Sequence, residues 1–155
     1  MQRILIVSDT HKRLGNLYEA LEKEGSVDAM IHLGDLEGDE NIVNEMIPGP
    51  VYMVPGNNDY YSQAPRELEI QLAGKNVLLT HGHYYYVSLD LQTLRQEGIA
   101  RGMDIVMFGH THRQVIQVED EITLIDLDLR LMKQFPINYL GAIQYNIKYT
   151  SWESA

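Results

Sequence analysis

Aspartate, asparagine and histidine recur in this 155-residue chain in five short groups, each of which follows an apolar run. The groups read Ser8-Asp9-Thr10-His11, Gly34-Asp35, Gly56-Asn57-Asn58-Asp59, His81-Gly82-His83 and Gly109-His110-Thr111-His112. Carboxylate, imidazole and amide ligands suit manganese, iron or zinc better than a soft copper site. The set is too large for one tetrahedral ion and about large enough for two ions that share a carboxylate. The sequence therefore predicts a centre of two divalent metal ions.

Spacing within the groups supports this prediction. Asp9 and His11 are two residues apart, as are His110 and His112, so in extended backbone both members of a pair point to the same side. A single histidine at a strand end is more often structural than a ligand. An aspartate there is usually a turn or N-cap residue. Five such groups in one short chain favour metal binding over coincidence.

The apolar runs predict strands that alternate with helices. We expect strands at 3–8, 29–33, 51–54, 68–72, 77–80, 105–108, 114–118 and 122–125, helices at 14–24, 39–46 and 89–101, and hairpin turns at 74–76 and 119–121. The early strand–helix–strand order implies parallel pairing, and the later strands imply antiparallel hairpins. Ligands of α/β sheets bind beyond the carboxyl ends of the strands, so the five groups should converge. The expected fold is an α/β layered sandwich in a single domain.

Composition narrows the class of protein. The net charge is −10, from 12 basic and 22 acidic residues, and no basic stripe indicates stable nucleic-acid binding. An acidic protein that handles phosphate needs local positive charge, which metal ions would supply. The chain has no cysteine, which excludes disulfides and thiolate metal sites and fits the expected cytoplasmic location. No run approaches the roughly 20 apolar residues of a membrane span, and we read the N-terminal apolar run as a strand.

The motifs D-x-H, G-D, G-N-x-D, H-G-H and G-H-T-H, in this order, resemble those of the calcineurin-like metallophosphoesterases. The most similar group is the small bacterial and archaeal phosphodiesterases related to the retromer subunit of eukaryotes. The resemblance covers residues 3–125 and implies two mixed β-sheets flanked by helices, with a dinuclear site at one edge. It also implies ligand roles: Asp9, His11 and His112 for the first metal, Asn57, His81 and His110 for the second, and Asp35 as the bridge.

The resemblance implies a metal-dependent phosphoesterase, most consistent with a phosphodiesterase. In that chemistry two cations about 3.5–4 Å apart bind the phosphoryl oxygens, and a bridging hydroxide attacks phosphorus. Manganese is the expected metal, with iron, zinc or nickel as alternatives. The expected partner is a small phosphate ester, with no membrane association, and self-association is left open. The competing hypothesis is a catalytically weak protein-binding scaffold like the retromer relative, although a degenerate scaffold should have lost ligands.

Two residues beside the ligands are catalytic candidates. Many relatives have a histidine that assists the leaving group where this chain has Asn58, and the small phosphodiesterases tend to lack it. Asn58 either donates to the leaving group or holds the loop that carries Asn57. His83 either contacts phosphate, supports a ligand or is a structural neighbour. We further expect Asp59 to orient a ligand loop and His32 to be a core imidazole.

Other neighbours leave alternatives open. Lys12 and Arg13 follow the first motif, where they contact substrate or, as we favour, form a solvated loop. Five tyrosines follow two of the motifs and offer either an aromatic wall for a base or aryl leaving group or, as we favour slightly, packing against the sheet edge: Tyr60, Tyr61, Tyr84, Tyr85 and Tyr86.

The C-terminal segment, residues 126–155, departs from the family pattern. Relatives continue with an Asn-Pro-Gly-Ser turn, whereas residues 127–133 read Leu-Asp-Leu-Arg-Leu-Met-Lys, which suggests helical or irregular structure before a last strand within 140–150. Codons for those seven residues can be chosen so that a one-base shift reads Pro-Gly-Ser-Pro-Ser-Tyr-Glu. A frameshift therefore accounts for the departure, and the gene's codons test this hypothesis.

Overall fold

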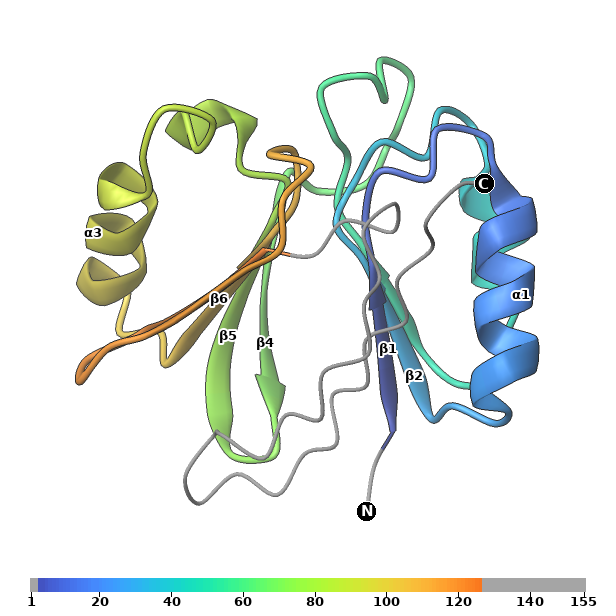
Figure 1. The fold of residues 1–155 in the computed structure, drawn as a ribbon, viewed down its shortest axis with the longest axis horizontal. Coiled ribbons are helices and arrows are strands. Elements are labelled where there is room, and N and C mark those ends of the chain that lie inside the picture. The colour runs from blue at the N-terminus through green and yellow to red at the C-terminus, as the bar shows by residue number, and fades with distance from the viewer. Residues whose placement is uncertain (1–2, 127–155) are drawn as a thin grey trace.

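A computed structural model describes residues 3–126, which form two β-sheets packed face to face with helices outside (Figure 1). In chain order the elements are β1 (Ile4–Val7), α1 (Leu14–Glu24), β2 (Ala29–His32), α2 (Glu40–Asn44), β3 (Val51–Met53), β4 (Glu67–Leu72), β5 (Lys75–Thr80), the 3₁₀ turn His83–Tyr85, α3 (Gln92–Ala100), β6 (Ile105–Phe108), β7 (Val115–Val118) and β8 (Thr123–Asp126). The predicted α/β layered sandwich is confirmed.

The two sheets differ in strand direction. The first has the order β1-β2-β3, with both pairs parallel. The second has the order β4-β5-β6-β8-β7, in which β5, β6 and β8 are parallel and the outer strands β4 and β7 are antiparallel to their neighbours. The expected antiparallel hairpins are therefore observed at β4–β5 and β7–β8, whereas the parallel pairing of β5, β6 and β8 was not predicted. Strand β5 reaches β6 through α3, and such a strand–helix–strand connection gives parallel pairing.

Three apolar clusters hold the layers together. The cluster between the sheets contains Ile6, Ile31, Leu33, Val54, Val77, Leu79, Ile105, Met107 and Ile125. A second cluster packs α1 and α2 onto the outer face of the first sheet, and a third packs α3 onto the second sheet. Because central strands are covered on both faces, they are continuous apolar runs. Each fully buried leucine, such as Leu79, contributes about 1.5–3 kcal/mol.

Local sequence signals explain where the elements end. Helix α1 buries Leu17 and Ala20 and ends at Gly25, whose φ is 74° and whose N–H donates to the Leu21 carbonyl at 2.9 Å. The β4–β5 turn consists of Ala73 and Gly74, with φ of 48° and 79°, so Lys75 is already paired with Leu72. The predicted turn at 74–76 was therefore placed too late, because two successive residues with positive φ suffice for a hairpin loop.

Two helices are shorter than predicted, and one short element was not predicted. Helix α2 covers Glu40–Asn44 instead of 39–46, and α3 covers Gln92–Ala100 instead of 89–101. The 3₁₀ turn His83–Tyr85 lies outside the predicted strands and helices. Expectations for 127–155 lie outside the described residues. Among the described helices none is long and apolar enough to cross a membrane.

Candidate metal centre

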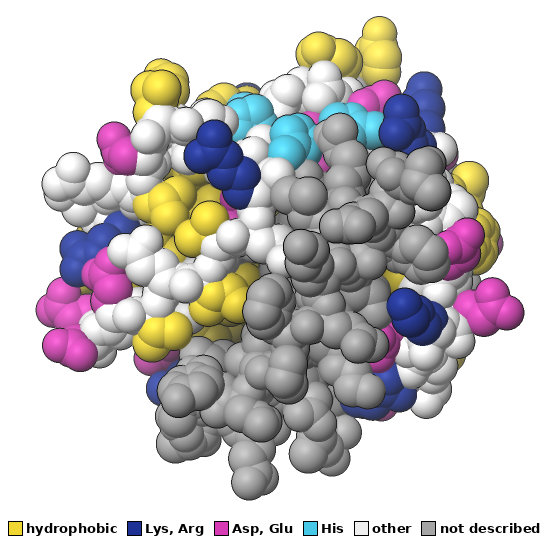
Figure 2. All heavy atoms as spheres, viewed as in Figure 1, with side chains coloured by type: hydrophobic (Ala, Val, Ile, Leu, Met, Phe, Trp, Pro, Cys, Tyr) yellow, Lys and Arg dark blue, Asp and Glu magenta, His cyan; other side chains and the backbone are white. Residues whose placement is uncertain are grey.

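The loops that follow β1, β2, β3, β5 and β6 meet at one edge of the sandwich, where the carboxyl ends of these strands lie (Figure 1). Backbone hydrogen bonds join the loops: the Asp9 N–H donates to the Gly34 carbonyl at 2.9 Å, and the Gly109 N–H donates to the His81 carbonyl at 3.1 Å. Figure 2 shows histidine side chains gathered along this edge. The expected convergence of the five groups is observed.

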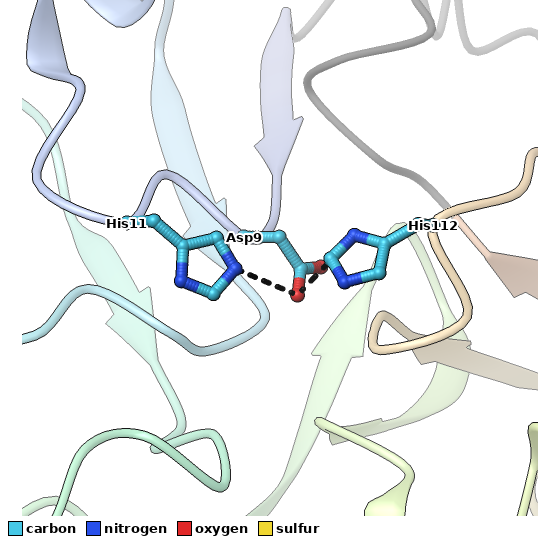
Figure 3. Close-up of side chains that lie close together, drawn as sticks. All are labelled: Asp9, His11 and His112. Atoms are coloured by element: carbon cyan, nitrogen blue, oxygen red, sulfur yellow. Dashed lines mark ion pairs between the residues drawn. The ribbon is translucent and has the colours of Figure 1, made fainter.

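One group of potential ligands consists of Asp9, His11 and His112 (Figure 3). The buried Asp9 carboxylate lies between the two imidazoles, with its Oδ1 3.8 Å from His11 Nε2 and 3.9 Å from His112 Nδ1. Asp9 and His11 come from the first sheet, and His112 comes from the second. These side chains can surround one cation at the junction of the sheets.

A second group consists of Asp9, Asp35 and His81. The Asp35 Oδ2 atom is 3.6 Å from Nε2 of both His11 and His81, so this carboxylate lies between the two histidine sets. Asn57 Oδ1 is 3.0 Å from His81 Nε2, and the His110 ring centroid is 5.1 Å from that of His81. Asp35 therefore lies within reach of both histidine sets.

The hydrogen bonds of the two central histidines fix which nitrogen faces inward. His81 Nδ1 lies 2.7 Å from the Leu33 carbonyl oxygen, which can only accept, so Nδ1 carries the proton. Likewise His11 Nδ1 donates to Glu37 Oε1 at 2.5 Å. In a neutral ring whose Nδ1 carries the proton, Nε2 has a free lone pair. The Nε2 atoms of His11 and His81 therefore face oxygen atoms that also carry lone pairs, on Asp9, Asp35 and Asn57. His11 Nε2 and Asp9 Oδ1 are buried and have no hydrogen-bond partner among the described residues. A bound cation resolves this arrangement, so the residues fit a metal.

The backbone around these ligands is strained. Five of the seven predicted ligands have left-handed φ values between 45° and 73°: Asp9, His11, Asp35, His110 and His112. Such conformations cost non-glycine residues about 1–3 kcal/mol each and cluster at functional sites. The rest of the fold therefore stabilises these left-handed conformations, which are unfavourable for the local backbone but orient the ligand side chains.

Two glycines allow the strand ends to come this close. A Cβ atom on Gly56 would lie 2.1 Å from Asp35 Oδ1, and one on Gly109 would lie 2.0 Å from Ser8 Oγ and 3.0 Å from Asp9 Oδ2. The neighbouring Ser8 hydroxyl and the Asp35 and Asp9 carboxylates leave space only for a residue without a side chain.

Three polar residues hold the carboxylates in place. Asn58 donates its backbone N–H to Asp35 Oδ1 at 2.9 Å and its side-chain amide to Asp35 Oδ2 at 2.8 Å. Asp59 accepts backbone N–H groups of Asp35, Glu37 and Gly56. The Ser8 hydroxyl donates to Asp9 Oδ2, which leaves Oδ1 toward the two histidines. The expectation that Asp59 orients a ligand loop is confirmed.

The surroundings favour ionised carboxylate and neutral imidazole. Burial raises the pKa of Asp35, but hydrogen bonds from Asn58 and the nearby His81 outweigh burial, and the net pKa lies below its usual range. Burial and the neighbouring His81 lower the pKa of His110. The same two causes lower the pKa of His83 to about 4. Near neutral pH these groups are therefore in the protonation states that metal ligands need.

Comparison with known proteins agrees with this geometry. Residues 2–127 match the family described as "Calcineurin-like phosphoesterase superfamily domain". The chain belongs to this superfamily. Among curated calcineurin-like relatives, the "Probable metallophosphoesterase" of Bacillus subtilis is 31% identical over 110 residues, which are 70% of this chain and 63% of that protein. The chain thus spans less than two thirds of the length of this relative. A phosphodiesterase of Methanocaldococcus jannaschii is 27% identical over 142 residues, 80% of this chain and 81% of the relative.

Two solved structures have the same fold. A predicted phosphoesterase from Streptococcus pneumoniae aligns with a TM-score of 0.69 and 26% identity, over 83% of this chain and 73% of that one. Vacuolar protein sorting 29 of Cryptosporidium parvum aligns with a TM-score of 0.67 and 18% identity, over 81% of this chain and 72% of that one. At that identity the second likeness concerns the fold alone.

The structure brings all seven predicted ligands to one edge, and the two catalytic candidates lie beside them. Asn58 contacts Asp35, as described, which is the contact expected if it holds the loop. The His83 ring lies 5.3 Å from that of His81 and 6.0 Å from that of His110, and its buried Nδ1 has no partner among the described residues. His32 is fully buried, with Nε2 3.1 Å from Thr10 Oγ1, which confirms the core imidazole.

Sequence reasoning was wrong about the tyrosines and missed one residue. Tyr60, Tyr61, Tyr84 and Tyr86 are exposed, so packing against the sheet edge holds only for the partly buried Tyr85. Glu37, which contacts His11, was not considered. Its position two residues after Asp35 was an available signal, because the D-x-H pair has the same spacing.

Proposed function

We propose that the protein is a metal-dependent phosphodiesterase with two metal ions, held by Asp9, His11 and His112 on one side and by Asn57, His81 and His110 on the other, with Asp35 between them. The observation that carries the proposal is the convergence of lone-pair atoms at the sheet junction, where His11 Nε2 and Asp9 Oδ1 lie buried without hydrogen-bond partners among the described residues. The name of the Methanocaldococcus relative supports a phosphodiester substrate.

The bound cations would supply Lewis acidity and a water acidified near neutral pH. The protein's own residues do the positioning. Leu33 and Glu37 orient the two central imidazoles, and Asn58 holds both oxygens of Asp35. His83, kept neutral by its low pKa, has one ring N–H that can donate a hydrogen bond to a phosphoryl oxygen. Manganese fits the mixed oxygen and nitrogen ligand set, as do iron, zinc and nickel.

A metal-replacement experiment tests the proposal. Protein stripped with chelator should not hydrolyse bis(p-nitrophenyl) phosphate, and Mn²⁺ should restore hydrolysis with about two ions bound per chain by elemental analysis. His32→Gln is a suitable control, because His32 is buried near the site but belongs to neither ligand group. Equal activity of stripped and Mn²⁺-loaded protein would overturn the proposal.

The scaffold hypothesis makes a different prediction for the same experiment. One solved structure of vacuolar protein sorting 29, from Entamoeba histolytica, is a complex with Zn²⁺, at 18% identity and a TM-score of 0.68. Metal binding by itself therefore does not separate the two functions. Turnover does: a scaffold would bind metal and leave the ester intact.

A further inference from the structure

A cavity of roughly 600 Å³ opens directly beside the metal centre. Its walls come from the segment 37–41, which follows Asp35, and from the loop 58–64, which follows Asn57. Glu37 and Asn58 belong both to the cavity and to the centre, because Glu37 contacts His11 and Asn58 contacts Asp35. A molecule in the cavity would therefore lie next to the ligands.

Two adjacent tyrosines, Tyr60 and Tyr61, are among the residues that line this cavity. The side chains of Tyr60 and Tyr61 are 81% and 94% exposed, and neither belongs to the apolar clusters of the described residues. The loop does not need their rings for its shape, because its own hydrogen bonds hold it. Asp59 N–H donates to the Gly56 carbonyl at 3.2 Å, and Ser62 N–H donates to the Asp59 carbonyl at 3.2 Å. Exposed aromatic rings beside a cavity are available to a ligand.

Polar groups line the rest of the cavity. Asp59 and Glu37 are already engaged by backbone N–H groups and by His11. The remaining lining includes the Lys12 ammonium, the Glu40 carboxylate and two amides, Asn41 and Gln63. Donors and acceptors around a pair of rings suit a planar group that carries its own polar edge.

We propose that this cavity binds an organic ester group of the substrate, and that this group is a planar aromatic ring held against Tyr60 and Tyr61. The inference rests on the proposed phosphoesterase function and adds a substrate class to it. The aromatic group has two sources, a nucleobase or a simple aryl ester, and they share the same stacking chemistry.

Binding of phosphonates, which carry the ring but cannot be hydrolysed, tests the inference. Calorimetry on the Mn²⁺-loaded protein should show phenylphosphonate binding on the order of tenfold more tightly than methylphosphonate, since both present the same anion. The double variant Tyr60→Ala/Tyr61→Ala should abolish this preference and leave methylphosphonate binding unchanged. Tyr61→Phe should retain it, because the ring remains. Tyr18→Ala, which removes an exposed ring from α1, is the matched control.

A third ligand distinguishes the two sources. The phosphonate analogue of adenosine 5′-monophosphate, which cannot be hydrolysed, identifies a nucleobase if it binds more tightly than phenylphosphonate and loses that affinity in the double variant. Weaker binding identifies a simple aryl group. Equal binding of phenyl- and methylphosphonate to the wild type overturns the inference, as does a preference that survives the double variant. Either result leaves the proposed function intact if bis(p-nitrophenyl) phosphate is hydrolysed. Absence of both hydrolysis and phosphonate binding removes the proposed function and the inference together.

Discussion

Glu37 should determine metal affinity without binding metal itself. Its carboxylate accepts from His11 Nδ1 at 2.5 Å, so it selects the tautomer that aims Nε2 at Asp9 and Asp35. Partners of this kind typically contribute 10–100-fold to metal affinity, or about 1.4–2.7 kcal/mol. The Glu37 side chain is 30% exposed, and solvent weakens a charge-assisted hydrogen bond, so the lower half of that range applies. Glu37→Ala should therefore raise the Kd of the metal site that contains His11 about 10- to 30-fold.

The assay is isothermal titration of chelator-stripped protein with Mn²⁺, which reads affinity without turnover. Glu37→Gln should lose less than Glu37→Ala, because the amide oxygen still accepts from Nδ1 while the charge is gone. Glu40→Ala is the matched control, since it removes a neighbouring carboxylate that also lines the cavity. A Kd for Glu37→Ala within twofold of the wild type would refute the reasoning, as would an equal loss in Glu40→Ala.

Three further predictions concern the bridge, the leaving group and pH. Asp35→Asn should weaken both metal sites and reduce activity more than His11→Ala, because Asp35 Oδ2 lies 3.6 Å from both central imidazoles; metal stoichiometry and kcat measure this. With Asn58, which cannot transfer a proton, rates should fall steeply with leaving-group pKa, and Asn58→His should flatten that slope by part of the 10²–10⁴-fold available to a general acid. Parallel slopes at equal metal occupancy would remove Asn58 from the chemistry. Burial, with help from His81, lowers the pKa of His32 to about 3, so the unfolded chain takes up a proton at this residue first as pH falls. Its contribution to stability is complete above the unfolded pKa of about 6.5 and falls by roughly 2 kcal/mol between pH 6.5 and 5. Urea unfolding of stripped wild type and His32→Gln at these two pH values should show the smaller drop in the variant.

The strand-and-helix order and the convergence of the motif groups at one sheet edge were accessible from sequence because both depend on local pattern. Continuous apolar runs mark strands that are covered on both faces, and the motif groups lie at their carboxyl ends. The parallel addition of β8 to β6 was not accessible, because register between distant strands depends on tertiary packing and not on a local signal. The tyrosines were misread for a related reason: aromatic residues next to a sheet usually pack, and only the self-contained hydrogen bonding of the 58–64 loop shows that these rings are not needed there.

Glu37 shows the same limit at the level of one side chain. Its contact with His11 crosses 26 positions of sequence and depends on two residues with positive φ, Asp35 and Glu37 itself. Asp adopts positive φ more often than most residues, but a glutamate rarely does, so the spacing after Asp35 could mark Glu37 as a candidate without predicting this conformation. The role of Glu37 therefore depends on a backbone conformation that becomes visible only in the folded structure.

The position of the ligands on two different sheets has a consequence for the apolar core. Asp9, His11, Asp35 and Asn57 follow strands of the first sheet, whereas His81, His110 and His112 follow strands of the second. The spacing across the centre thus depends on the side chains packed between the layers, among them Leu79 and Met107. Substituting larger or smaller residues at these two positions would change the distance between the ligands of the two sheets, although neither residue is itself a predicted ligand. Metal affinity should therefore respond to changes in core packing away from the ligands. Repacking the interior would then shift the preference among metals of different radius while every ligand is kept.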